Sequence, residues 1–395
     1  MIKKANRKVV KKGVGKVINK ALIGVLVLAL VLAGAAGAYT FYLGEQMAAS
    51  QKQQAAEISA LHEETVALGE ETQARIDALD NELKGVALEM EQSLINAGEL
   101  YQEVSQSIFR ISNGQDMLGS GFAFDAAGHI LTNQHVIEGQ NPIYIISPDG
   151  HTSSATIIGA CEYSDVAVLR QSLFLPALTV PALTLADSTT VKVGEPVIVI
   201  GNPFDLPWTL TSGIVSQTDR TVEIKYNLGS RGVANIIQFD AAINFGNSGG
   251  PLLNAKGEVI GMVVARIDPA SADGIYWAIS SNKVRRVALS LIEQGSFDYP
   301  WLGVEITNLT PETAIVRNLE TVNGALVKTV MPANPAEAAG VRADDIIVAI
   351  NGTQVQDIAD LTCYLGEYVS YNDEVTLTLI RDGAEIELPL TVGKR

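Results

Sequence analysis

The distribution of apolar and charged side chains divides the 395-residue chain into three stretches. Residues 1–20 carry eight Lys or Arg and no acid, and residues 21–44 carry no charged side chain. An uncharged run of this length exceeds the ~20 residues that a helix needs to cross a bilayer, and basic residues before such a run indicate a cytoplasmic N-terminus. We therefore predict a basic cytoplasmic tail over residues 1–20 and a transmembrane anchor over residues 21–44.

A cleaved signal peptide is the alternative interpretation of this N-terminal stretch. The Ala-Gly-Ala at residues 36–38 has the small residues of a signal-peptidase site, and residues 21–31 would be its apolar core. We favour the uncleaved anchor because the span is long and because three aromatic residues at positions 39–42 suit a membrane interface.

Residues 45–106 form the second stretch, which is rich in Ala, Glu, Gln and Leu and contains no proline. Apolar side chains alternate at spacings of three and four, at Ile76, Leu79, Leu83, Val86 and Met90. This spacing is typical of a helix that packs along one seam, so we predict a helical, coiled-coil stalk over residues 45–106. Thr65 and Thr72 weaken the seam, and a solvated single helix or a disordered stalk is the alternative.

The third stretch contains short apolar runs bounded by turn residues. In its last part, such runs predict strands at residues 301–306, 324–327, 344–352, 374–380 and 384–392. Pro335–Gly340 reads as a short helix that ends at a glycine, and residues 357–368 as a second helix.

One segment of the third stretch has the chemistry of a serine nucleophile. Residues 246–252 read Gly-Asn-Ser-Gly-Gly-Pro-Leu. Glycine on both sides of Ser248 allows a sharp turn and close approach to a substrate. The amides of Gly246 and Ser248, with Asn247 as a third candidate, would then form an oxyanion hole. A glycine-rich turn between two strands is the alternative.

A serine hydroxyl needs a neighbouring base, and the chain has only four histidines. His62 lies in a polar helical stretch, and His129 and His151 follow turn residues, so we expect these three at the surface. His135 differs because it follows an apolar strand that passes into a short polar segment, which is a natural rim for a cleft. We therefore predict His135 as the general base; a structural histidine is the alternative.

Asp165 is our candidate for the acid that orients this histidine. It directly precedes the apolar run Val-Ala-Val-Leu, and a carboxylate there is costly to bury unless it has a partner such as an imidazole N–H. An exposed aspartate at the start of a strand is the alternative. Asp240 competes for the role, but we interpret it as a support for the loop around Ser248.

Six segments in this order resemble the HtrA/Deg family of serine proteases: Gly119–Phe122, Thr132–Val136, Asp165–Leu169, Gly201–Pro203, Thr211–Val215 and Gly246–Gly250. The order His135, Asp165, Ser248 is also that of chymotrypsin. The resemblance implies a mainly β fold, with two six-stranded barrels and the triad between them, over residues 107–296. It also implies serine-type endopeptidase activity and a homotrimer.

The position six residues before the nucleophile holds an acid in trypsin-like enzymes that select basic side chains. Here that position is Ala242, so we predict an uncharged S1 pocket and cleavage after small or aliphatic residues. The sequence departs from common family patterns at Phe245. It also has a long stretch, Thr218–Ala234, which we expect to be a mobile loop.

The last part of the chain, residues 297–395, resembles a PDZ domain of the kind attached to HtrA proteases. Such domains bind an extended peptide along a strand edge and hold its C-terminal carboxylate with backbone amides. Trp301, Leu302, Gly303 and Val304 match the family's carboxylate-binding loop. A packing domain with a blocked groove is the alternative.

Charge and cysteine content narrow the list of partners. Removing the eight positive charges of residues 1–20 from the net charge of −16 leaves −24 for the remainder. This acidic part argues against binding to nucleic acid or, beyond the tail, to anionic lipid. Cys161 and Cys363 lie in different predicted domains, so we expect buried thiols, and no Cys/His spacing predicts a metal or cofactor site.

Together these patterns predict a single-pass protein of the cell membrane with extracytoplasmic protease and PDZ domains. It would degrade or process unfolded or misfolded proteins and recognise peptide C-termini. A proteolytically silent, chaperone-like or PDZ scaffold is the alternative.

Overall fold

The computed structural model describes residues 24–27, 29–31, 33–34, 51–93, 96–172, 180–226, 229–264, 273–317 and 319–395. The chain divides into one unit up to Glu89 and a second from Met90. The predicted basic tail, most of the predicted anchor and the candidate cleavage site lie outside the described residues. Within the described ranges, no helix combines the length and hydropathy that crossing a bilayer needs.

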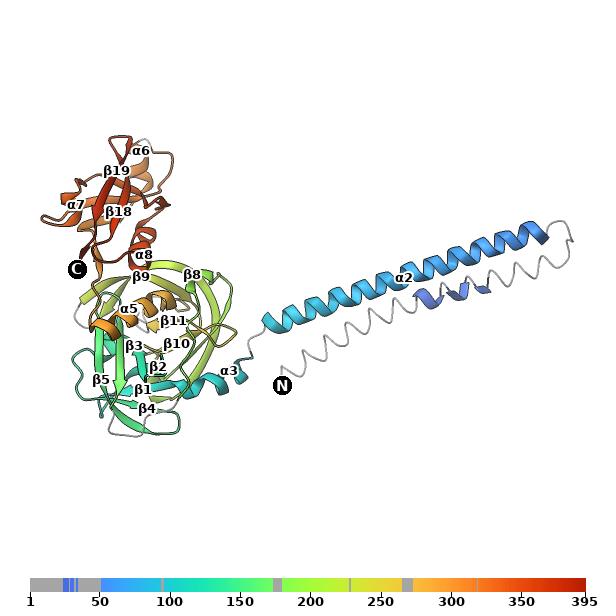
Figure 1. The fold of residues 1–395 in the computed structure, drawn as a ribbon, viewed down its shortest axis with the longest axis horizontal. Helices are drawn as coiled ribbons and strands as arrows, with labels where there is room; N and C mark the ends of the chain where they lie inside the picture. The colour runs from blue at the N-terminus through green and yellow to red at the C-terminus, as the bar shows by residue number, and fades with distance from the viewer. Residues whose placement is uncertain are drawn as a thin grey trace. The chain divides into compact units, whose positions relative to one another are not determined.

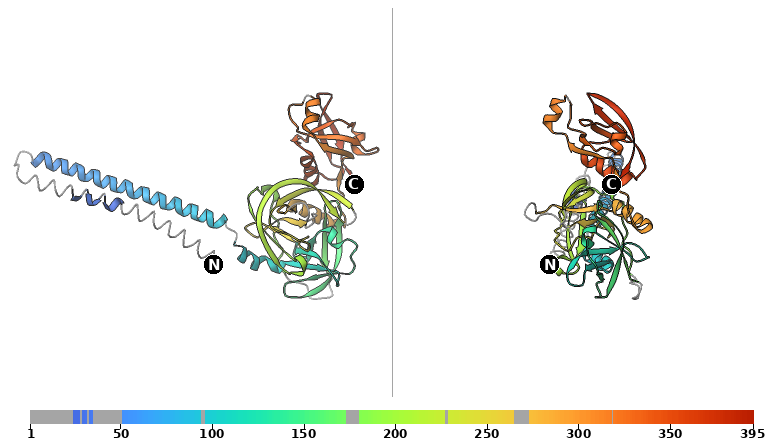
Figure 2. Two further views of the ribbon diagram at one scale, coloured as in Figure 1. Left: turned by 180° about the vertical axis from the view of Figure 1, so that it is seen from behind. Right: turned by 90° about the vertical axis from the view of Figure 1, so that its left-hand side faces the viewer.

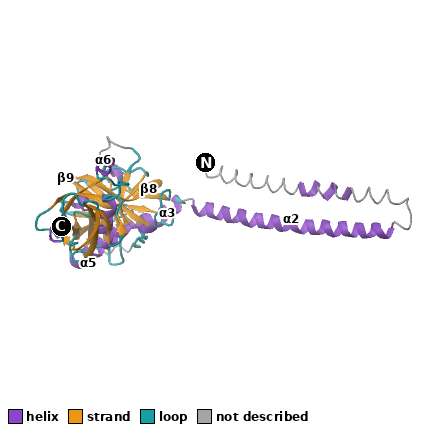
Figure 3. Cartoon of the chain, turned by 90° about the horizontal axis from the view of Figure 1, so that it is seen from above, coloured by secondary structure: helices purple, strands orange, loops and turns teal. Residues whose placement is uncertain are grey.

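Helix α2 (Gln51–Ser93) runs for 43 residues through the segment in which we predict a stalk. It is the long purple helix of Figure 3. Leu79 and Leu83, two members of the expected seam, are 64% and 40% exposed. An apolar seam of this kind is available for packing against another helix.

The next helix, α3 (Ala97–Val104), differs from the prediction that the stalk continues to residue 106. Asn96 caps its N-terminus by accepting a hydrogen bond from the Glu99 amide at 3.4 Å. Leu100 and Val104 are buried in the core of the second unit. This helix therefore packs with the protease part of the chain.

The first barrel is built from six antiparallel strands. These are β1 (Ile108–Ser112), β2 (Met117–Ala123), β3 (His129–Thr132), β4 (Ile143–Ile146), β5 (Thr152–Cys161) and β6 (Val166–Gln171). They close in the order β1-β2-β3-β6-β5-β4. The 3₁₀ turn η1 (Ser105–Ser107) precedes β1, and the one-turn helix α4 (Gln134–Ile137) follows β3.

A second closed barrel follows, in the order β10-β11-β12-β9-β8-β7. Its strands are β7 (Pro196–Gly201), β8 (Thr209–Tyr226), β9 (Gly229–Phe239), β10 (Pro251–Leu253), β11 (Val259–Val264) and β12 (Tyr276–Ser280). Short 3₁₀ turns, η2 (Ser188–Thr190) and η3 (Pro203–Asp205), flank β7, and α5 (Ser281–Gln294) ends the domain. The barrels run from teal to gold in Figure 1 and in the two views of Figure 2.

The stretch Thr218–Ala234, which we expected to be a mobile loop, is instead the outer part of the paired strands β8 and β9. Residues 227 and 228 at its tip are not described. The sequence signal for pairing is the alternation from Val222 to Tyr226, in which Ile224 and Tyr226 are buried and Glu223 and Lys225 are exposed. When composition alone is considered, a strand with charged residues on its outer face is easily mistaken for a loop.

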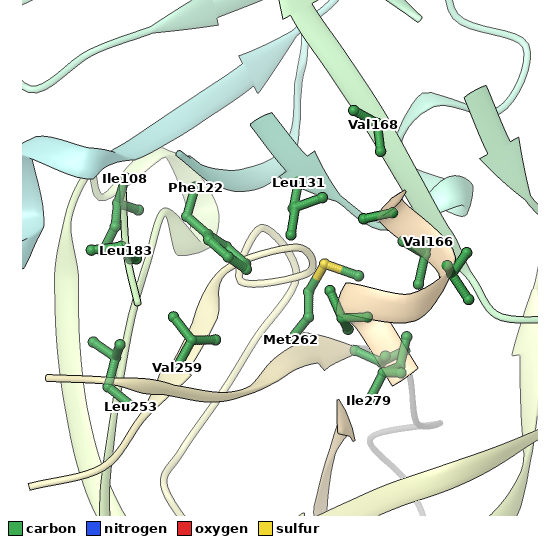
Figure 4. Packing of buried hydrophobic residues seen from close by; sticks show 14 of the residues in the cluster. Ile108, Phe122, Leu131, Val166, Val168, Leu183, Leu253, Val259, Met262 and Ile279 are labelled. Carbon is green, nitrogen blue, oxygen red and sulfur yellow. The ribbon is translucent and has the colours of Figure 1, made fainter. Parts of the chain in front are cut away.

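A shared apolar layer joins the two barrels. Figure 4 shows Phe122 and Leu131 of the first barrel pointing toward Met262 and Val259 of the second. The side of α5 that carries Val287 and Leu291 packs into the same layer. Close packing in this layer therefore fixes the separation of the two barrels.

The C-terminal part has the strand and helix order expected of a PDZ domain. Its elements are β13 (Pro300–Trp301), β14 (Val304–Asn308), α6 (Pro311–Val316), β15 (Ala325–Val330), α7 (Pro335–Ala338), β16 (Ile346–Ile350), β17 (Thr353–Gln354), α8 (Ile358–Tyr368), β18 (Glu374–Arg381), β19 (Ala384–Thr391) and β20 (Gly393–Lys394). The main sheet has the order β14-β15-β16-β18-β19, so β14 is an edge strand. Asp357 caps α8 by accepting from the amides of Ala359 and Asp360.

Candidate active site

Ser248 lies in the tight loop between β9 and β10, where the backbone requires glycine. Gly246 and Gly249 have φ angles of +104° and +81°, which side-chain-bearing residues rarely adopt. A Cβ atom on Gly249 would lie 2.2 Å from the Ser120 carbonyl oxygen. The Ser120 amide in turn donates to the Ser248 carbonyl at 2.8 Å, which attaches the loop to β2 of the first barrel.

The structure brings the three predicted triad side chains together at the junction of the barrels. His135 Nε2 lies 3.1 Å from Ser248 Oγ, and His135 Nδ1 lies 2.8 Å from Asp165 Oδ2. Asp165 is fully buried, Ser248 is 4% exposed, and the His135 side chain is 9% exposed. This is the geometry in which an imidazole accepts the proton of a hydroxyl while a carboxylate fixes its tautomer.

Asp165 is held from both its side chain and its backbone. Its Oδ1 accepts from the backbone amide of His135 at 3.0 Å, and its carbonyl accepts from Asn133 Nδ2 at 3.1 Å. Its φ angle is +52°, a left-handed conformation that is uncommon for aspartate. These bonds direct the carboxylate at the imidazole and compensate for its burial.

The peptide group between Phe245 and Gly246 bears on the predicted oxyanion hole, because its N–H is one of the expected donors. The Phe245 carbonyl accepts a hydrogen bond from the Phe204 amide at 3.1 Å. Because C=O and N–H point in opposite directions in a trans peptide, this bond turns the Gly246 N–H away from Phe204. The Asn247 amide donates to the Asn244 carbonyl at 3.0 Å, so the prediction of Asn247 as a further oxyanion donor is wrong. A β-turn over residues 244–247 uses that amide, and the sequence does not reveal this turn.

The competing acid, Asp240, and two other histidines, His129 and His151, have the following environments. Asp240 lies away from the triad and accepts from the Ile214 amide at 2.7 Å, which ties β8 to the segment leading to Ser248. His129, expected at the surface, is 7% exposed, with Nδ1 2.7 Å from Asp125 Oδ2. Partial burial raises the pKa of Asp125, but hydrogen bonds from His129 outweigh it and hold the pKa below its usual value. His151 is exposed, as expected.

Ala242, the predicted S1 residue, is exposed between the buried Ala241 and Ile243. Residues 265–272, which follow β11, lie outside the described residues.

The predicted carboxylate-binding loop lines a cavity of about 200 Å³ in the second unit. The lining includes Trp301, Leu302, Gly303 and Val304, together with Ile306, Leu361 and Leu365. Residues of the protease part, among them Tyr163, Thr221, Gly232 and Ala234, also line it. The guanidinium of Arg395 lies 4.4 Å from the ring centres of both Tyr163 and Trp301. The lining is largely apolar, and among its described residues Arg395 is the one charged side chain.

Both cysteines are free and buried, as expected. Two contributions were missed from the sequence: the Phe204 amide that orients the Phe245 carbonyl, and Tyr226, whose ring lies against His135. Both depend on long-range backbone geometry, and no local pattern signals either.

Comparisons with known proteins place this geometry in context. A model of the trypsin-like peptidase domain matches residues 119–262, and a model of the PDZ domain matches residues 300–392. The HtrA-type protease AlgW, solved with a tripeptide, has a TM-score of 0.64 and 31% identity, covering 76% of this chain and 97% of that chain.

Curated relatives carry related names. The "Probable periplasmic serine endoprotease DegP-like" of Chlamydia trachomatis is 38% identical over 275 residues, 69% of this chain and 53% of that protein. The "Serine protease Do-like HtrB" of Bacillus subtilis is 35% identical over 276 residues, 68% of this chain and 59% of that protein. The chain thus spans between half and three-fifths of the length of these relatives.

Proposed function

The chain belongs to the HtrA-type family of serine proteases, and on that premise we propose that it is a serine endopeptidase with Ser248 as its nucleophile. Ser248 Oγ attacks the scissile carbonyl while His135 takes its proton and later returns it to the leaving amine. Asp165 holds the imidazole in the tautomer whose Nε2 accepts. The amides of Gly246 and Ser248 stabilise the oxyanion.

The observation that carries this proposal is the buried Ser248–His135–Asp165 chain, with contacts of 3.1 Å and 2.8 Å. The test is Ser248→Ala in the full chain, with unfolded β-casein as substrate. We expect turnover to fall by roughly 10⁴- to 10⁶-fold. Cleavage by this variant at the parental rate, in protein from a protease-free source, would refute the proposal.

The alternative, a proteolytically silent scaffold, makes a different prediction for a fluorophosphonate probe. An active enzyme is labelled covalently at Ser248, whereas a scaffold is not. The buried hydrogen-bonded triad favours the enzyme.

We propose that the substrates are unfolded or misfolded polypeptides and that cleavage follows small or aliphatic residues. The support is Ala242 at the position that would otherwise carry a selecting acid. Sequencing of the cleavage products tests this: mainly Lys or Arg at P1 would contradict it.

For the PDZ domain we propose capture of peptide C-termini in the cavity beside Trp301, Leu302, Gly303 and Val304. Solved relatives with a bound tripeptide or decapeptide support a peptide ligand. A fluorescence-anisotropy titration compares an apolar-ended peptide as free acid and as C-terminal amide. Equal affinities would exclude carboxylate capture.

We also propose that residues 21–44 anchor the protein in the cell membrane, with the domain over 107–296 and the PDZ domain over 297–395 outside the cytoplasm. The uncharged run at 21–44 and the relatives named periplasmic support this location. A homotrimer with a stalk formed by α2 fits the exposed apolar seam. Alkaline extraction of membranes tests the anchor, and release of the full chain would contradict it.

A further inference from the structure

The ribbon formed by β8 and β9 places two side chains beside the proposed catalytic histidine. Tyr226 is the last residue of β8, and Arg231 lies near the start of β9, paired across the ribbon with Ile224. We infer that Tyr226 and Arg231 are positioning residues that hold the His135 imidazole between Asp165 and Ser248. The inference rests on the proposed serine-protease function.

The ring of Tyr226 packs beside the imidazole in a tilted arrangement. The centres of the two rings are 5.5 Å apart, with an angle of 51° between their planes. Tyr226 is 7% exposed, so its ring is itself held by packing. Both nitrogen atoms of His135 are already engaged at the ring edge, Nδ1 with Asp165 and Nε2 with Ser248. A buried ring packed beside the imidazole opposes the rotation that would break these two contacts.

Arg231 in turn contacts the Tyr226 ring. Its guanidinium carbon lies 5.0 Å from the centre of the Tyr226 ring, within the range of a cation–π contact. The guanidinium, with a side chain only 14% exposed, is paired with Glu162 at 2.9 Å and lies 3.7 Å from Glu138. Both of these contacts use the guanidinium Nη2, and the second terminal nitrogen, Nη1, donates to Gln134 Oε1 at 3.4 Å.

These partners flank the two residues that the mechanism needs from the first barrel. Gln134 directly precedes His135, and Glu138 follows the short helix α4 that carries it. The Glu162 carbonyl accepts from the Asp165 amide at 3.3 Å. One arginine from the second barrel therefore links the segment of the base to the segment of the orienting acid. Because a positional error of about 1 Å at a reacting group can cost about 100-fold in rate, such a link bears directly on catalysis.

The side-chain direction along β8 supplies a matched control. Lys225 is adjacent to Tyr226 but exposed, so it faces away from His135. We would compare Tyr226→Leu, Tyr226→Phe, Arg231→Met and Lys225→Gln in the full chain. The measurements are kcat and KM on a short chromogenic peptide, the rate of fluorophosphonate labelling at Ser248, and the thermal unfolding midpoint.

We expect Tyr226→Leu and Arg231→Met to lower kcat and the labelling rate by roughly 10- to 100-fold, with KM changed by less than about 3-fold. Tyr226→Phe keeps the ring, so it and Lys225→Gln should keep the parental values. Arg231→Met retains the Tyr226 side chain and changes a residue that is only partly buried, so it serves if Tyr226→Leu fails to fold.

Parental labelling rates in a folded Arg231→Met variant would overturn the inference while leaving the proposed function intact. A loss in Tyr226→Phe as large as in Tyr226→Leu would also overturn it, because the hydroxyl and not the ring face would then matter. An unlabelled parental chain would instead overturn the proposed function, and the inference with it.

Discussion

The carboxylate of Asp165 is fully buried in the proposed active site, and its oxygens contact the ring and the backbone amide of His135. Both oxygens lie within 3.0 Å of His135 Nδ1, and one also accepts from the His135 backbone amide. An acceptor at this position forces the ring proton onto Nδ1 and leaves Nε2 free to take the serine proton.

Asp165→Asn should therefore preserve shape and destroy activity. The amide of Asn presents a donor to Nδ1, which favours the wrong tautomer, and we expect kcat to fall about 10⁴-fold. Hydrolysis of a chromogenic peptide measures the loss, and unchanged affinity for a PDZ peptide is the control. A decrease smaller than tenfold would show that another group orients His135.

Gly249 illustrates how a residue without a side chain fixes the position of one that reacts. A Cβ here would lie 2.2 Å from Ser120 O and 2.4 Å from Thr132 Oγ1, at a φ of +81°. We expect Gly249→Ala to reduce the free energy of unfolding by about 2–5 kcal/mol, from backbone strain and overpacking together.

Gly128 is the matched control for this substitution, since its φ is +83° but nothing lies within 4 Å of the added Cβ. Gly128→Ala should cost only the backbone strain, about 1–2 kcal/mol. Denaturant unfolding of both variants makes the comparison. Equal losses would mean that the close contacts at Gly249 relax without cost.

At this scale the sequence is informative where chemistry follows from residue type and neighbours. The glycines around Ser248, the strand end at His135 and the apolar run after Asp165 are local features, and the structure brings these residues together. The prediction failed for Asn247 because the direction of its amide depends on φ and ψ. It failed for His129 because this residue is already the first of the buried strand β3, where it pairs with Arg170, and is not part of the preceding turn.

Among the elements, helix α3 packs into the barrel core although its amino-acid composition is similar to that of the preceding stalk. Its residues continue the Ala- and Glu-rich composition of the stalk, yet Leu100 and Val104 enter the core of the barrels. The break is marked only by the Asn96 cap. The β8–β9 ribbon shows the converse, since a polar stretch that resembled a loop extends two strands.

If α3 is part of the protease core, Leu100→Ala should destabilise it. Leu100 is 7% exposed, and we expect a loss of about 2–4 kcal/mol from burial and cavity formation. Leu289→Ala, at a position of α5 that is 45% exposed, should change the free energy of unfolding by less than about 1 kcal/mol. Urea unfolding followed by tryptophan fluorescence measures both. Equal losses of unfolding free energy in the two variants would indicate that α3 belongs to the stalk and not to the core.

Within the second unit, helix α8 of the PDZ part packs against the protease part through polar contacts. Cys363 Sγ accepts from the Asn235 amide at 3.1 Å, and burial raises the pKa of this thiol to about 11. Arg286 of α5 donates to the Gly366 carbonyl at 2.6 Å and to the carbonyl of Val369. The charge pattern of α8 gave no indication of this docking surface, because its partners come from distant strands.

Glu367 makes this contact pH-dependent. Its carboxylate accepts from Asn282 at 3.0 Å and from Asn235 at 3.1 Å. Desolvation raises the pKa of Glu367, and the nearby Asp219 and Asp187 add to the increase. The folded state therefore binds this proton more tightly than the unfolded chain. The resulting stability is fully present below the ordinary glutamate pKa and is lost as the pH rises through the folded value.

Glu367→Gln removes this titration. We expect the parental chain to be more stable relative to Glu367→Gln at about pH 4 than at about pH 7.5, because only the parental side chain becomes charged in between. Urea unfolding of both proteins at the two pH values gives the comparison. A difference that is constant, or that grows with pH, would contradict the assignment.

The division of the triad between the barrels has a consequence for the lifetime of the enzyme. His135 and Asp165 belong to the first barrel and Ser248 to the second, and the apolar layer of Figure 4, together with the hydrogen bond from the Ser120 amide to the Ser248 carbonyl, holds the barrels at this separation. If Ser248, His135 and Asp165 form the proposed triad, neither barrel alone should hydrolyse peptides, and a nick that lets the two halves dissociate should abolish activity even though every reactive group survives. Complementary fragments should regain turnover only upon reassociation, so that activity itself reports whether the protein is whole.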